Sequence, residues 1–102
     1  MKETNWFVET LEKEFLVDVN KDQVSYEGNE LCLDEIDESL IPSEMTEGLP
    51  EVLLFETMIF EDEVGTEWIG IIALHPSNRE WLLQIILKDG VPVLRKRIEE
   101  EN

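Results

Sequence analysis

Apolar residues in the first fifteen positions recur at the spacing of an α-helix. Phe7, Leu11 and Phe15 lie four residues apart, and polar or charged residues fill most of the positions between them. Trp6 adjoins the first of the three. Because this spacing places the apolar side chains on one face, an amphipathic helix is predicted over about residues 4–14.

The next stretch alternates apolar and polar residues, which is the period of a β-strand. It contains FLVDV and then QVSYEGNELCL, in which EGN has the composition of a tight turn. The alternation predicts a strand at residues 15–19 and two short strands on either side of a turn at residues 27–29.

Residues 34–50 combine many acids with a few apolar residues and several helix breakers. Ile36, Leu40 and Ile41 stand among the acids, and two prolines and a glycine come after them. This composition predicts a short helical turn followed by a loop.

Two strongly apolar stretches come next, EVLLFETMIF and EWIGIIALH, with the polar sequence EDEVGTE between them. Their β-branched and aromatic residues favour strands, and the polar sequence favours a turn, so an antiparallel pair is predicted. Apolar residues occur at both odd and even positions of each strand. Both faces of the sheet are therefore expected to be covered.

The stretch HPSNREWLLQIILKDG fits a helix or a strand. Ser77 and Glu80 match a helix capping box, but alternate residues from Trp81 onward are apolar, and KDGV is typical of a two-residue hairpin turn. A strand is favoured. The last segment, with Pro92 and the basic run RKR, suits an edge strand, although Pro92 would equally suit the first turn of a C-terminal helix.

Together these elements predict an α+β fold. The N-terminal amphipathic helix is expected to pack on a mostly antiparallel β-sheet of about four to six strands, with a strand or a helix at the C-terminus. A chain of 102 residues without a linker indicates a single globular domain over residues 1–102.

The charge of the chain narrows the choice of partners. The formal net charge is −17, and no Lys or Arg occurs between Asp22 and Asn78. Binding to nucleic acid or to an anionic membrane surface depends on basic residues, so neither is expected. A protein of high negative charge attracts basic molecules, and a basic protein partner is therefore predicted.

The sequence also bears on the compartment. The first residues mix charges and aromatic groups and lack the apolar core of a signal peptide, and no apolar run reaches the length of a membrane span. The single cysteine cannot form an internal disulfide. A cytoplasmic protein is expected.

Two sequence features resemble catalytic or metal-binding groups. Asp18, Asn20 and Asp22 begin like a calcium loop, but Gln23 and Asn29 occupy the positions that require glycine and glutamate. The stretch is therefore predicted to be a polar connection between strands. The lone histidine, His75, precedes a proline at a strand end and is interpreted as part of a turn.

Two further residues carry side chains that can be reactive. Glu56 interrupts an apolar strand, where a carboxylate either performs acid–base chemistry or, more often, is paired or lies at a sheet edge. Cys32 lies between two leucines and is interpreted as a small core residue. No phosphate loop or nucleophile motif is present, so no enzyme activity, cofactor or metal is expected.

The leading hypothesis is a protein-binding protein, an inhibitor or immunity protein that covers the positive cleft of a basic partner such as a nuclease toxin. Its contact residues are predicted in two acidic stretches of the base-free span, which would form one surface if they converge. They are Asp34, Glu35, Asp37, Glu38, Ile41, Glu44, Met45, Glu47, Glu61, Asp62, Glu63 and Glu67.

Two alternatives remain open from the sequence. One is a DNA-mimic regulator whose carboxylates occupy a DNA-binding protein. The other is a chaperone or adaptor for a secreted protein, in which apolar strand faces pair across a homodimer.

Overall fold

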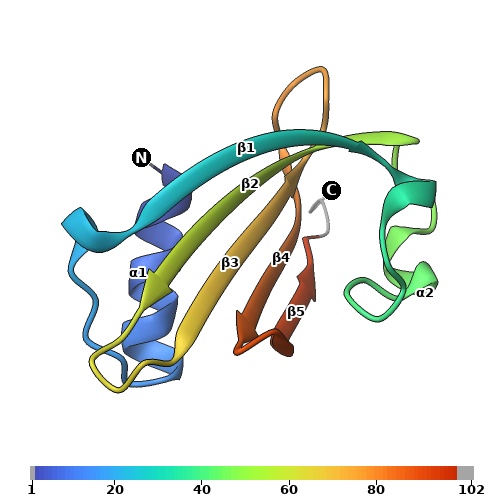
Figure 1. Cartoon of the computed structure of the whole chain (residues 1–102). Coiled ribbons are helices and arrows are strands. Elements are labelled where there is room, and N and C mark those ends of the chain that lie inside the picture. The colour runs from blue at the N-terminus through green and yellow to red at the C-terminus, as the bar shows by residue number, and fades with distance from the viewer. Residues whose placement is uncertain (1, 99–102) are drawn as a thin grey trace.

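The computed structural model describes residues 2–98 and has an N-terminal helix packed on a five-stranded antiparallel sheet (Figure 1). This confirms the predicted α+β fold, with a strand at the C-terminal end. The principal elements are α1 (Lys2–Glu14), β1 (Ser25–Cys32), β2 (Val52–Glu61), β3 (Glu67–Leu74), β4 (Trp81–Lys88) and β5 (Val91–Arg97).

The sheet is a meander in which each strand pairs with the next one along the chain. The turn between β4 and β5 has positive φ at both Asp89 (48°) and Gly90 (81°), as a two-residue type I′ hairpin requires. KDGV therefore forms the hairpin turn that the sequence predicts. The interpretation of β4 as a strand is confirmed. Pro92 lies in β5, at the edge of the sheet.

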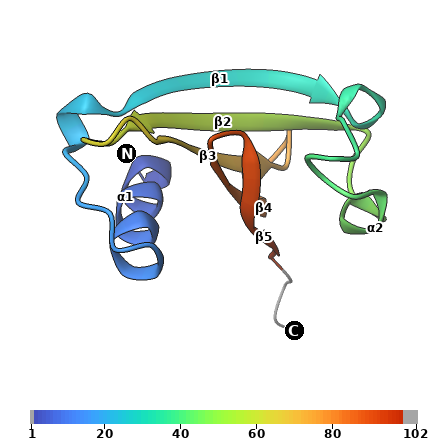
Figure 2. The same ribbon diagram turned by 60° about the horizontal axis from the view of Figure 1, so that its bottom comes forward.

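Helix α1 covers one face of the sheet. Its buried residues Phe7, Val8 and Leu11 pack in a cluster with Met58 and Ile72 of the central strands. The opposite face carries a second cluster, which the segment between β1 and β2 covers. Figure 2 shows the two coverings, with β4 and β5 lying between α1 and this segment. Both faces are thus covered within the chain, as the apolar pattern predicted.

The covering segment runs from residue 33 to residue 51 and contains little regular structure. A 3₁₀ turn, η2 (Leu33–Glu35), comes after β1, and a single helical turn, α2 (Ser43–Thr46), precedes β2. Ile41 lies between them with 2% of its surface exposed, and it packs on the sheet. This matches the predicted short helical turn and loop.

The predicted strand at residues 15–19 is wrong. Helix α1 ends in a cap in which the amides of Phe15 and Val17 both donate to the carbonyl of Leu11, and Leu16 adopts a left-handed φ of 55°. That geometry is typical of a helix C-terminus and interrupts an extended chain. The apolar residues at alternate positions of FLVDV instead belong to, or pack against, the hydrophobic cluster that contains the buried residues of α1.

The predicted turn at residues 27–29 is also wrong, because β1 runs without interruption through EGN. Gly28 lies opposite Glu56 of β2, and a Cβ atom at this position would lie 3.0 Å from Glu56 Oε2. The glycine therefore leaves space for a neighbouring carboxylate. Its role depends on tertiary structure and is invisible in local composition.

No helix in the described part of the chain is long and apolar enough to cross a membrane.

Candidate functional site: the acidic segment and the buried glutamate

The acidic segment, residues 34–47, is fixed to the sheet by two arginines of β5. Arg95 Nη2 donates to the carbonyl of Ser39 at 2.6 Å and Arg95 Nε to that of Leu40 at 3.0 Å, while Arg97 Nη1 donates to the carbonyl of Glu47 at 2.7 Å. The arginines bind backbone oxygens and leave the carboxylates of the segment unpaired. The basic run of β5 thus positions an acidic surface without neutralising its side chains.

Two of the acids hold the segment in shape. The Asp37 carboxylate accepts hydrogen bonds from the Ser39 amide and hydroxyl, and the amide bond, followed by the hydroxyl bond, lowers the pKa of Asp37. Glu35 accepts a hydrogen bond from the Cys32 amide at 3.2 Å. These two carboxylates have a structural role in addition to their charge.

The other acids of the segment point to solvent. Within residues 2–98 the only ion pair with nitrogen and oxygen within 4 Å joins Arg79 to Glu56, which lies outside the segment. The carboxylates left free for a partner are those of Asp34, Glu38, Glu44 and Glu47, all of which are exposed.

The two apolar residues predicted as contact anchors have different environments. Ile41 is buried in the core beneath the segment, so its side chain is unavailable as a surface anchor. Met45 is half-buried in α2 and packs on the same cluster. The contact expected at these positions therefore reduces to the exposed part of Met45.

The second predicted acidic stretch is the tip of the β2–β3 hairpin, residues 61–67. The Asp62 carboxylate accepts hydrogen bonds from the amides of Val64 and Thr66 and from Trp68 Nε1. The Trp68 bond is the largest cause of the lowered pKa of Asp62. Asp62 therefore closes the turn. Glu61, Glu63 and Glu67 are exposed.

The two acidic stretches lie at opposite ends of the sheet (Figures 1 and 2). The acidic segment precedes the first residue of β2 and the tip lies beyond its last, so the length of that strand separates them. Ten extended residues span about 30 Å. The two acidic stretches therefore do not converge into one continuous acidic surface. Each stretch is a separate acidic region at its own end of the sheet.

A buried carboxylate lies on the α1 face of the sheet. Glu56 is only 5% exposed, and its two oxygens accept hydrogen bonds from the Tyr26 hydroxyl and, at 2.8 Å, from Arg79 Nη2. Arg79 adopts a left-handed φ of 59° in the turn after β3, which costs an arginine about 1 kcal/mol. The sequence left open whether Glu56 performs acid–base chemistry or is a paired carboxylate. These contacts show that it is paired.

Tyr26 provides a direct probe of this network because it is the only tyrosine in the chain. Burial of the hydroxyl and its hydrogen bond to Glu56 raise the pKa of Tyr26 from 10.0 to about 12. A folded-state pKa above the unfolded value means that this contact stabilises the fold below about pH 10 and is lost as pH rises toward about 12.

Phenolate absorbance after a rapid pH jump should therefore titrate near pH 12 in the folded protein and near pH 10 in denaturant. Glu56→Gln should lower the folded midpoint, whereas Glu27→Gln, on the opposite face of β1, should leave it in place. A folded midpoint near 10 in the unaltered chain would contradict the contact.

His75 and the calcium-like stretch both have local structural roles. The Ser77 amide donates to His75 Nδ1 at 3.1 Å, within the turn between β3 and β4. Asn20 accepts from the Asp22 amide and caps the 3₁₀ turn η1 (Lys21–Gln23). This polar connection joins α1 to β1, so the expectation that it joins two strands is corrected.

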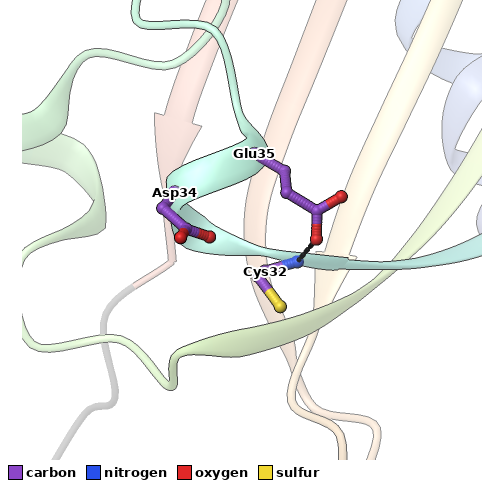
Figure 3. A group of neighbouring side chains, drawn as sticks. All are labelled: Cys32, Asp34 and Glu35. Atoms are coloured by element: carbon purple, nitrogen blue, oxygen red, sulfur yellow. Dashed lines mark hydrogen bonds between the residues drawn. The ribbon is translucent and has the colours of Figure 1, made fainter.

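Cys32 is exposed at the end of β1, so its interpretation as a core residue is wrong. Its sulfur lies near the carboxylates of Asp34 and Glu35, with candidate ligand atoms all within 4.8 Å of one another (Figure 3). A hydrogen bond between the thiol and the Glu35 side chain, some loss of hydration and the nearby negative charges raise the pKa of the Cys32 thiol. A protonated thiol is a poor nucleophile.

No known protein family, curated protein or solved structure matches this chain. The basis for a function is therefore the chemistry of its own residues.

Sequence reasoning missed the partners of Glu56 and the arginine contacts to the acidic segment. Tyr26, Arg79 and Arg95 are each more than twenty residues from the groups they bind. The one available signal was Gly28 in an otherwise regular strand pattern, since such a glycine often marks a close approach of another group.

Proposed function

We propose that this protein binds a basic protein partner through the acidic segment, and that it acts as an inhibitor or immunity protein that covers a positive cleft, most simply that of a nuclease. The observation that carries the proposal is the arrangement around residues 34–47. Arg95 and Arg97 fix its backbone, while Asp34, Glu38, Glu44 and Glu47 remain exposed and unpaired within residues 2–98.

The physical advantage of this arrangement is preorganisation. A segment already fixed by its own hydrogen bonds loses less conformational entropy when it binds than a free loop would. Within residues 2–98 its four free carboxylates have no cation partner, so the lysines and arginines of a partner would displace only water and counter-ions. The negative field also accelerates encounter with a basic cleft.

The test is capture by the immobilised protein from lysate of its source cells at low ionic strength, followed by elution with a step of salt. The unaltered protein should retain a basic protein that the salt releases. A loop-neutral variant, in which the four free carboxylates become amides, should not retain it. The substitutions are Asp34→Asn, Glu38→Gln, Glu44→Gln and Glu47→Gln.

A helix-side variant supplies the matched control, because it removes the same number of charges from exposed sites far from the segment in sequence. Its substitutions are Glu9→Gln, Glu12→Gln, Asp18→Asn and Asp22→Asn. This variant should capture the partner as the unaltered protein does. An equal loss of capture in both variants would mean that net charge alone drives binding, and undiminished capture by both would mean that these carboxylates do not contribute; either result would make the proposal wrong.

A further inference from the structure

The outer edge of β1 presents unpaired backbone groups. Leu33 donates its amide to the Glu51 carbonyl at 2.7 Å, which extends the β1–β2 register by one bonded pair. Bonded pairs alternate along an antiparallel ladder, so Asn29 and Leu31 also face β2. The amides and carbonyls of the residues between them point away from the sheet. These residues are Tyr26, Gly28 and Glu30.

The position of Cys32 independently supports this alternation. Its amide lies outside the ladder and donates to the Glu35 side chain. The other even-numbered residues of β1 have no neighbouring strand on their outer side, because β1 is the first strand of the sheet.

The two edges of the sheet differ in how they discourage pairing with other chains. Strand β5 contains Pro92 and three basic residues, and its register with β4 shifts at residue 87. Those features commonly block an edge. Strand β1 has eight residues in unbroken register, no proline and no lysine or arginine, and all of its residues except Leu31 are exposed.

From this contrast we propose that the edge of β1 binds an extended basic segment of the partner as a sixth strand. The proposal rests on the proposed function, which supplies a basic partner. Glu27 and Glu30 lie on this strand, and Asp34 and Glu35 lie just beyond its end. Two copies paired through β1 would bring these like charges together, whereas lysine or arginine on an added strand would be attracted.

Amide hydrogen exchange measured by NMR tests this edge residue by residue. The probe is a peptide as long as β1 in which lysine alternates with threonine. The control peptide has the same number of lysines but proline in place of threonine, so it carries equal charge and cannot form a strand.

In the free protein the amides of Gly28 and Glu30 should exchange rapidly and those of Asn29 and Leu31 slowly. The lysine–threonine peptide should slow Gly28 and Glu30 by roughly tenfold or more, and the proline peptide should leave them unchanged. Equal binding of both peptides without protection at the edge would overturn strand addition while leaving the acidic surface as a binding site. Protection that rises with protein concentration alone would identify a second copy as the occupant and overturn the proposal.

A pair of variants separates the backbone contact from charge. Glu30→Pro removes an outward amide and a carboxylate, whereas Glu30→Gln removes the carboxylate alone. The proline variant should bind the lysine–threonine peptide roughly tenfold more weakly than the glutamine variant. Equal affinities, in chains with the same melting temperature, would contradict a bond at this amide. Loss of capture by the loop-neutral variant tests the proposed function separately.

Discussion

Replacing Phe7 by Ala is expected to lower the free energy of unfolding by about 3–5 kcal/mol. Phe7 has no exposed surface, and its ring packs on Gly70 at the centre of β3. The substitution removes a fully buried aromatic ring of α1 and leaves a cavity beside main chain, which cannot move to fill it. Unfolding in denaturant, with linear extrapolation to water, measures the loss.

Gly70→Ala supplies a matched test of the same contact. In the unaltered chain the added methyl group would overlap the Phe7 ring, at a cost of about 1–3 kcal/mol. In the Phe7→Ala chain the same methyl group would enter vacated space, so it should be neutral or stabilising there. Equal destabilisation in both backgrounds would contradict direct packing of the ring on this glycine.

The second large effect concerns binding. The loop-neutral variant is expected to bind the captured partner roughly 4- to 1,000-fold more weakly at low ionic strength, since four exposed ion pairs contribute about 0.2–1 kcal/mol each. The difference should shrink as salt is added, because salt screens contacts between exposed charges. The helix-side variant should behave like the unaltered protein throughout, and both variants should retain the unaltered melting behaviour within a few degrees.

Much of the fold could be predicted from periodicity. The spacing of Phe7, Leu11 and their neighbours indicated the buried face of α1, and KDGV identified the last hairpin. These predictions succeeded because they depend on local geometry and on burial of one face. The failure at FLVDV arose because a helix cap with Leu16 in the left-handed region leaves the same alternation as a short strand.

The separation of the two acidic stretches could also have been predicted from the sequence. EVLLFETMIF has the composition of a strand, and an extended strand of that length holds the segments at its two ends far apart. This strand lies inside the span from Asp22 to Asn78 that lacks Lys and Arg. The acidic stretches at the two ends of the strand therefore cannot lie on one surface. The hypothesis that the two stretches would form one surface if they converged took account of the charge of the span but not of the strand inside it.

Other features could not have been foreseen from the chain alone. Glu56 could be catalytic or paired until the structure placed Tyr26 and Arg79, both distant in sequence, on its oxygens. Likewise RKR suggested protection of an edge, but Arg95 and Arg97 also reach carbonyls more than forty residues away. Such long-range polar contacts leave no periodic signal.

The most direct test of the central claim is the affinity of the captured partner as a function of salt concentration, measured for the unaltered protein and both variants. A steep salt dependence shared by the unaltered and helix-side proteins, and a shallow one for the loop-neutral variant, is the predicted result. If the three proteins show the same slope and the same affinity, residues 34–47 are not the binding surface.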